Sequence, residues 1–145
     1  MTGQTIAQAL KYKARLLKEY KQILTNIVNE NSKPAGSIRY YNVKDLLKEA
    51  TSKLEELVSL KVKIHRASDP VRDKIFQLSE LKSLLQNLSG LDVFEGKKSD
   101  YSSSERVPYD VQINQEEKNN FLKQFQNAIN NIQDELDVFN AKILI

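Results

Sequence analysis

Residues 114–145 have the sequence NQEEKNNFLKQFQNAINNIQDELDVFNAKILI, which contains the most regular apolar pattern of the chain. Its large apolar residues recur in alternating steps of three and four, at Leu122, Phe125, Ile129, Ile132, Leu136, Phe139 and Ile143. This period is that of an α-helix with one apolar side, and it is typical of helices that pack along coiled-coil seams. Asn114 and Glu117 have the spacing of a capping box. The stretch therefore predicts a helix over residues 114–141.

Two more helices are expected in the first half of the chain. Apolar residues at helical spacing predict one helix over residues 5–29. A second is predicted over residues 43–67, with Asn42 as the N-cap. Its predicted seam has a heptad spacing that one lysine interrupts, and it consists of Val43, Leu47, Ala50, Leu54, Leu57, Lys61 and Ile64.

A third helix of this kind is expected over residues 70–88, after a break that is either a turn or a kink. Pro70 suits the first position of a helix, where no backbone N–H is needed, and Asp69 can cap it. Gly90 suggests a left-handed residue at the other end. The remaining loop, residues 89–113, contains a short alternating tract that allows a small β-hairpin.

Together these spans predict an all-α fold. Long helices joined by short links favour an antiparallel bundle of about four helices with coiled-coil-like seams, formed by residues 1–145 as a single domain. The chain has only 4 Gly and 3 Pro among its 145 residues, which argues against an all-β fold rich in turns. No apolar run is long enough to span a bilayer and no secretion signal is evident, so a cytoplasmic protein is expected.

The composition argues against most catalytic and metal-dependent chemistry. With no cysteine and a single histidine, His65, thiolate sites and multi-histidine metal sites are excluded. We therefore expect neither an enzyme nor a cofactor. The one enzymatic alternative is a site in which the loop residues Tyr101, Ser104 and Glu105 meet His65 and Arg66 at the end of the second helix.

Two groups of residues are candidates for binding a partner. Arg39, Tyr40 and Tyr41 follow a polar linker, and arginine and tyrosine are the residue types that dominate interface hot spots. The polar segment from Tyr101 to Arg106 lies in the longest predicted loop, and long loops are often functional. Packing of the loop over the open end of the bundle would explain the first group equally well. For the second group, ordering of the loop by Ser and Glu bonds to backbone groups is the favoured explanation.

A lysine-rich side of the first helix offers an alternative function. Lys11, Lys18 and Lys21 could neutralise phosphates, and the interleaved Tyr12 and Tyr20 could stack on bases. The net charge of +3 does not by itself identify a partner. Accessory nucleic-acid binding is thus the second hypothesis.

Several short motifs resemble the septicolysin-like family, small helical proteins of bacteria and their phages. They are Ile64-His65-Arg66, the downstream Asp73, Tyr101-Ser102-Ser103-Ser104-Glu105 and Ile132-Gln133 in the last helix. The resemblance covers most of the chain and implies a bacterial cell or phage host. The positions that match the family pattern, without an assigned role, are Arg66, Asp73, Tyr101, Ser102, Ser104 and Glu105.

The leading hypothesis is a non-enzymatic protein–protein interaction or structural module that forms a homo-oligomer through its helical seams. Neighbouring apolar pairs widen the apolar side of several helices beyond one seam, namely Leu16-Leu17, Ile23-Leu24, Ile27-Val28 and Leu84-Leu85. A helix of this kind can contact partners on two sides, one of which can be another subunit. A larger core within one monomer is the competing explanation.

Overall fold

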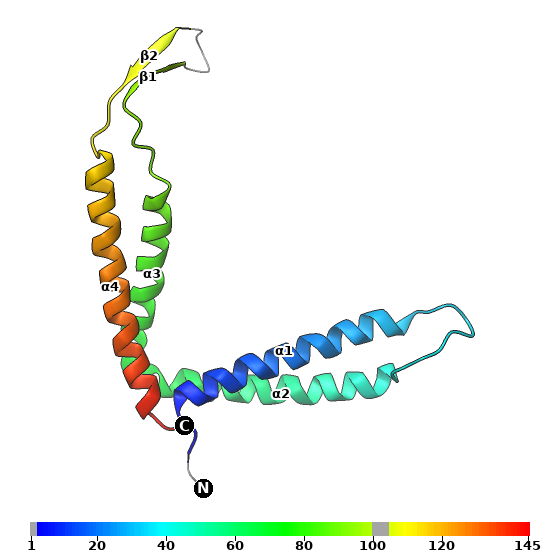
Figure 1. Ribbon diagram of the computed structural model, residues 1–145. Coiled ribbons are helices and arrows are strands. Elements are labelled where there is room, and N and C mark those ends of the chain that lie inside the picture. Colours follow the sequence, from blue (N-terminus) through cyan, green and yellow to red (C-terminus); the bar gives the residue numbers. More distant parts are fainter. Residues whose placement is uncertain (1–2, 100–104) are drawn as a thin grey trace. The chain divides into compact units, whose positions relative to one another are not determined.

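A computed structural model describes residues 3–99 and 105–145, most of which are helical (Figure 1). The helices are α1 (Ile6–Asn31), α2 (Val43–Ala67), α3 (Arg72–Ser89) and α4 (Gln115–Lys142). The strands β1 (Gly96–Ser99) and β2 (Arg106–Tyr109) form an antiparallel hairpin. The expectation of a mainly α-helical chain with four long helices and a small hairpin is confirmed. Their assembly into one bundle with coiled-coil seams stays a prediction.

The chain divides into two compact units. The first consists of Met1–Pro70 with Asp137–Ile145, and the second consists of Val71–Leu136. In the first unit, backbone bonds join the two chain ends: Ile6 N donates to Ile143 O at 2.9 Å, and Ile145 N donates to Gln4 O at 2.8 Å. These bonds fix the start of α1, which Thr5 and Gln8 also close with a capping box.

In the first unit α1 and α2 pack against each other as an antiparallel helical hairpin (Figure 1). On each helix one row of buried and half-buried residues, spaced in steps of three and four, faces the other helix. We call these two rows the first seam. It consists of Ile6, Ala9, Lys13, Leu16, Tyr20, Ile23, Ile27 and Glu30 on α1, and of Leu46, Ala50, Lys53, Leu57, Leu60, Ile64 and Ala67 on α2. Its centre is a cluster of Ile23, Leu46 and Ala50, against which Tyr20 and Ile27 pack.

The seam that the sequence predicted for α2 is partly wrong. Leu57 and Ala50 are buried as expected, but Leu47 and Leu54 are 56% and 42% exposed. The reason is that α2 has two apolar rows one residue apart. It packs against α1 with the row that begins at Leu46, which leaves the other row at the surface.

The second unit contains α3, the β-hairpin and most of α4. An ion pair joins Lys74 to Glu135 near one end of the two helices, and Lys118 Nζ donates to Leu91 O at 2.9 Å near the other. The helices therefore run antiparallel. One row of buried and half-buried residues on each helix faces the other helix, and we call these two rows the second seam. It consists of Lys74, Leu78, Leu81, Leu85 and Leu88 on α3 with Val71 just before it, and of Lys118, Leu122, Phe125, Ile129, Ile132 and Leu136 on α4. The apolar row that the sequence predicted for α4 is thus buried or half-buried.

The helix ends agree with the sequence in two places and differ in two. Asn42 Oδ1 accepts from Asp45 N at 3.2 Å, and Asn114 and Glu117 form the predicted capping box. Pro70, however, lies in a short 3₁₀ helix, Asp69–Val71, so α3 starts after Val71 and has no side-chain cap. Gly90 has φ −88°, so it is not left-handed. Its N–H instead closes a turn on the Asn87 carbonyl.

Candidate functional site

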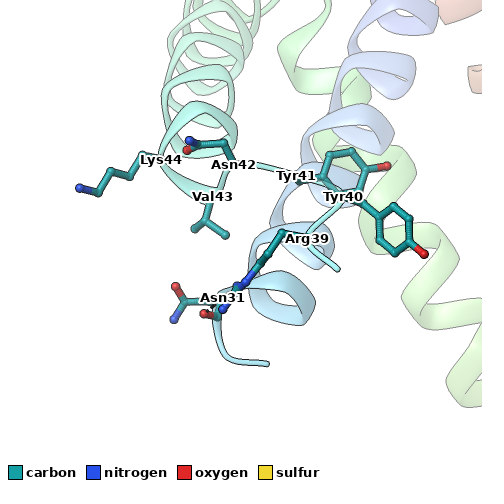
Figure 2. Close-up of a pocket in the computed structure, with 7 residues that line it drawn as sticks. All are labelled: Asn31, Arg39, Tyr40, Tyr41, Asn42, Val43 and Lys44. Carbon is teal, nitrogen blue, oxygen red and sulfur yellow. Dashed lines mark hydrogen bonds between the residues drawn. The ribbon is translucent and has the colours of Figure 1, made fainter. Parts of the chain in front are cut away.

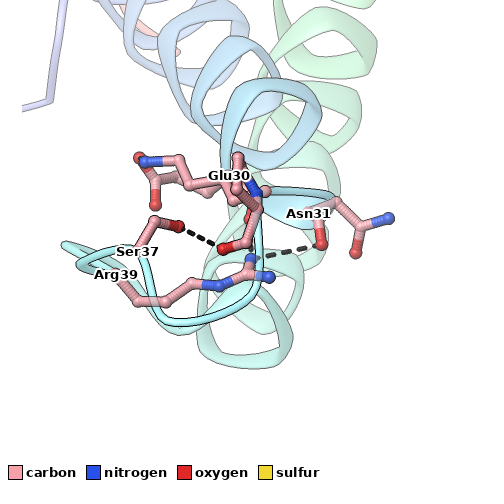
Figure 3. Close-up of polar contacts among 6 residues, drawn as sticks. Glu30, Asn31, Ser37 and Arg39 are labelled. Carbon is pink, nitrogen blue, oxygen red and sulfur yellow. Dashed lines mark hydrogen bonds and ion pairs between the residues drawn. The ribbon is translucent and has the colours of Figure 1, made fainter.

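Arg39, in the loop between α1 and α2, closes the C-terminal end of α1. Its guanidinium donates to the backbone carbonyls of Glu30 and Asn31, the latter at 3.1 Å (Figure 3). The last carbonyls of a helix have no partner within the helix, and a cation beside them interacts favourably with the helix dipole. The loop itself turns at Gly36, whose φ of +83° favours glycine, and Ser37 Oγ donates to Pro34 O at 2.7 Å.

The three residues predicted for this loop line one pocket. It is an open pocket of about 650 Å³ whose lining residues are Asn31, Arg39, Tyr40, Tyr41, Asn42, Val43 and Lys44 (Figure 2). Tyr40 is 74% exposed, and the ammonium of Lys33 lies 5.4 Å from the centroid of its ring. The Arg39 side chain extends toward Asn31 and thereby connects the loop to the end of α1 (Figure 2). This geometry is consistent with both a binding role and a purely structural one.

Glu30 supports the same loop and was missed by the sequence analysis. Glu30 is the last α1 residue of the first seam, and its Oε1 accepts from Lys33 Nζ at 2.7 Å. Within the described residues, the buried Oε2 has no hydrogen-bond partner. The pKa of Glu30 is lowered, first because Lys33 bonds the carboxylate, and further by the Tyr40 backbone N–H and the charge of Arg39, against the effect of burial. The sequence signal that could have identified Glu30 is its spacing. It lies seven residues after Ile23, in a row that also contains Ala9 and Leu16 at intervals of seven.

The lowered pKa of Glu30 predicts a loss of stability in acid. A carboxylate whose pKa is lower in the folded state stabilises the fold above its unfolded pKa, and this contribution disappears as the pH falls through the folded pKa. Glu30→Gln should therefore melt at a lower temperature than wild type at about pH 7, and this difference in melting temperature should become smaller as the pH falls to about pH 3. Glu55→Gln, at an exposed position of α2, is the control for removal of one surface carboxylate, and its melting temperature at about pH 7 should be close to that of wild type. A difference in melting temperature between wild type and Glu30→Gln that does not change with pH would contradict the stabilising role of the Glu30 carboxylate.

A second candidate surface lies along the α1–α2 hairpin. It is formed by those residues of 10–28 and 44–61 that directly follow a residue of the first seam or, at Lys44, the half-buried Val43, and we call it the apolar face. Its members are Leu10, Ala14, Leu17, Lys21, Leu24 and Val28 on α1, and Lys44, Leu47, Thr51, Leu54, Val58 and Lys61 on α2. In two antiparallel helices, the positions that follow the seam lie on the same side of the pair. The two rows therefore form one surface.

The opposite side of this hairpin is polar, and its contacts confirm the arrangement. Residues that precede a seam residue include Tyr12, Glu19, Glu49 and Glu56. Tyr12 donates to Glu56 across the two helices, and this bond is the first cause of its raised pKa. Lys53 pairs with Glu19 at 3.1 Å on the same side. Because these polar contacts join the helices on one side, the apolar rows share the other.

The predicted lysine row is exposed, but its tyrosines are occupied elsewhere. Lys11, Lys18 and Lys21 are all exposed on α1, and the last two border a groove of about 390 Å³. Tyr20 packs against the buried cluster of the first seam, and Tyr12 bonds Glu56 on the polar side. Base stacking beside these lysines therefore has no support in the structure. Nucleic-acid binding stays a prediction that rests on the lysines alone.

The remaining predicted site residues are spread over both units. Arg66 and His65 lie exposed in the last turn of α2, and Asp73 lies exposed in the first turn of α3. Arg106 begins β2 and is paired with Ser99, and Glu105 precedes it, also exposed. Three predicted residues lie outside the described residues, namely Tyr101, Ser102 and Ser104. The enzymatic alternative, which needs Ser104, therefore stays untested.

Metal sites and membrane-spanning helices are both absent from the described residues. No group of three or more histidine, aspartate or glutamate side chains there is placed to bind a metal ion. No helix in residues 3–99 and 105–145 combines the length and the apolar character needed to cross a membrane.

Comparisons with known proteins do not place the chain in a family. No family model, no curated protein and no solved structure matches it.

Proposed function

We propose that the chain is a non-enzymatic helical interaction module that self-associates through the apolar face of the α1–α2 hairpin. The observation that supports this proposal is the exposure of large aliphatic side chains in one continuous pattern. Val28 is 76% exposed, Leu47 56%, Val58 52%, Leu54 42% and Leu24 37%. Contiguous apolar surface on a folded protein is typical of an interaction site.

The contrast between the two sides of the hairpin strengthens the proposal. On the side that contains Glu19 and Glu56, every residue that directly precedes a seam residue is polar. The apolar face has leucine, valine and alanine at heptad spacing instead. This spacing suits a further helix that packs along the hairpin with its own apolar row. Burial of each exposed leucine or valine would contribute up to roughly 1.5–3 kcal/mol to such an association.

Light scattering over a range of protein concentrations tests the proposal. Wild type should form a discrete oligomer that dissociates only at low protein concentration, whereas Leu54→Gln/Val58→Gln should shift it toward the 16.7 kDa monomer at concentrations where wild type is associated. The matched control is Ser59→Gln/Lys63→Gln, at two exposed positions on the polar side of α2. It should associate as wild type does. Circular dichroism confirms that each variant is folded.

A wild type that is monomeric at every concentration would disprove self-association. Equal loss of association in both double variants would also count against the apolar face, because the control leaves that face intact.

A further inference from the structure

The α3–α4 hairpin has a surface whose charge is opposite to that of the apolar face. It consists of residues that directly precede a residue of the second seam, and we call it the acidic face. Its charged and apolar members are Asp73, Glu80 and Leu84 on α3, and Glu117, Phe121, Ala128 and Glu135 on α4. Because the two helices run antiparallel, these positions lie on one side of the pair.

Two large apolar side chains of the acidic face are open to contact. Leu84 is 39% exposed and Phe121 is 40% exposed. Asp73, Glu80 and Glu117 are exposed around them, and Glu135 forms the ion pair with Lys74. Within the described residues of this unit, no lysine or arginine precedes a residue of the second seam. The surface therefore has two exposed apolar side chains among acidic and neutral polar ones, the latter at Gln77, Asn87, Gln124 and Asn131.

The apolar face of the α1–α2 hairpin has the complementary charge. Its only formally charged members are Lys21, Lys44 and Lys61, all of which are exposed. Two apolar faces placed against each other would bring lysines together, and two acidic faces would bring carboxylates together. Like charges across an interface disfavour both arrangements, whereas the mixed arrangement places lysines beside carboxylates.

We propose that the acidic face of one copy of this chain docks on the apolar face of a second copy. This inference rests on the proposed self-association and names the surface that completes it. Apolar contact between residues such as Phe121 and Leu54 supplies the attraction, and the charged residues select the pairing. When two copies use both faces reciprocally, the assembly closes as a dimer and leaves neither face uncovered.

Charge reversal on either face tests the proposal with the full chain. The first variant is Lys21→Glu/Lys61→Glu on the apolar face, and the second is Asp73→Lys/Glu80→Lys on the acidic face. Each variant alone should associate at least about tenfold more weakly than wild type in analytical ultracentrifugation, because like charges now meet across the interface. An equimolar mixture of the two should recover association, because both contacts of the mixed dimer then pair opposite charges.

The control reverses charge on the polar side of the same hairpin. Arg15→Glu/Lys63→Glu makes the same change in net charge, with one substitution in each helix as in the first variant. It should associate as wild type does. If Lys21→Glu/Lys61→Glu unfolds, Lys44→Glu, at the exposed N-terminal turn of α2, replaces it with the same expected direction of effect.

The outcomes separate this inference from the proposed function. If wild type associates and Leu54→Gln/Val58→Gln prevents it, but neither charge reversal weakens association, the acidic face is not the partner and self-association stands. Failure of the mixed variants to recover association likewise overturns the pairing. A monomeric wild type overturns both proposals.

Discussion

Replacement of Leu57 by alanine is expected to lower the free energy of unfolding by roughly 2–5 kcal/mol. Leu57 is only 4% exposed and lies in the first seam between α1 and α2. Alanine removes apolar contacts there and leaves a cavity that the surrounding side chains fill only in part. Because a domain of this size has a net stability of only about 5–15 kcal/mol, urea unfolding should show a large shift of the midpoint.

Leu54→Ala is the matched control for Leu57→Ala. The two leucines lie three residues apart on α2, but Leu54 belongs to the apolar face and is 42% exposed. Its truncation in the monomer should lower the free energy of unfolding by less than about 1 kcal/mol. The comparison is made at a protein concentration where the oligomer is dissociated, since association would stabilise the fold further. Equal effects of the two substitutions would contradict the finding that the row with Leu57 is buried and the row with Leu54 is exposed.

Helix positions were predictable because single-residue signals agree with the apolar period. Asn42 starts α2 and Asn114 starts α4, each through a side chain that accepts a backbone N–H. In α4 only one apolar row exists at helical spacing, so its buried side was predicted correctly. The β-hairpin was also anticipated, from an alternating tract that includes Val107 and Tyr109.

The packed row of α2 could not be predicted in the same way. Leu46, Leu57 and Leu60 form one apolar row, and Leu47 and Leu54 form another beside it. Hydrophobic spacing alone fits both, and the choice depends on which row complements α1. The prediction chose a row that mixed both sets. The same two-row sequence that misled it is the basis for the proposed docking surface.

The loop site was predictable by residue type but not by role. Arg39, Tyr40 and Tyr41 were chosen by residue type and line one pocket, and their role in binding a partner stays a prediction. The contact of Arg39 with the end of α1 depends on how the loop folds back, which no local pattern specifies. Glu30 is harder still, because a carboxylate at a buried heptad position is unusual unless cations such as Lys33 lie nearby.

Ala50→Leu is expected to lower the free energy of unfolding by roughly 1–3 kcal/mol, through crowding instead of a cavity. Ala50 is 3% exposed and packs with Ile23 and Leu46 in the first seam. A leucine there has no free volume to enter, so it must displace these side chains or separate the two helices. Chemical denaturation measures the loss, and a lower melting temperature should accompany it.

Ala14→Leu makes the same substitution on the apolar face and should have a different result. Ala14 is exposed on α1 and borders an open groove, so a larger side chain has space to enter, and monomer stability should change by less than about 0.5 kcal/mol. The added apolar area should instead strengthen self-association in light scattering. A destabilising Ala14→Leu with a neutral Ala50→Leu would mean that the packed and exposed rows are interchanged. The pair therefore tests the assignment of the two rows on which both proposals depend.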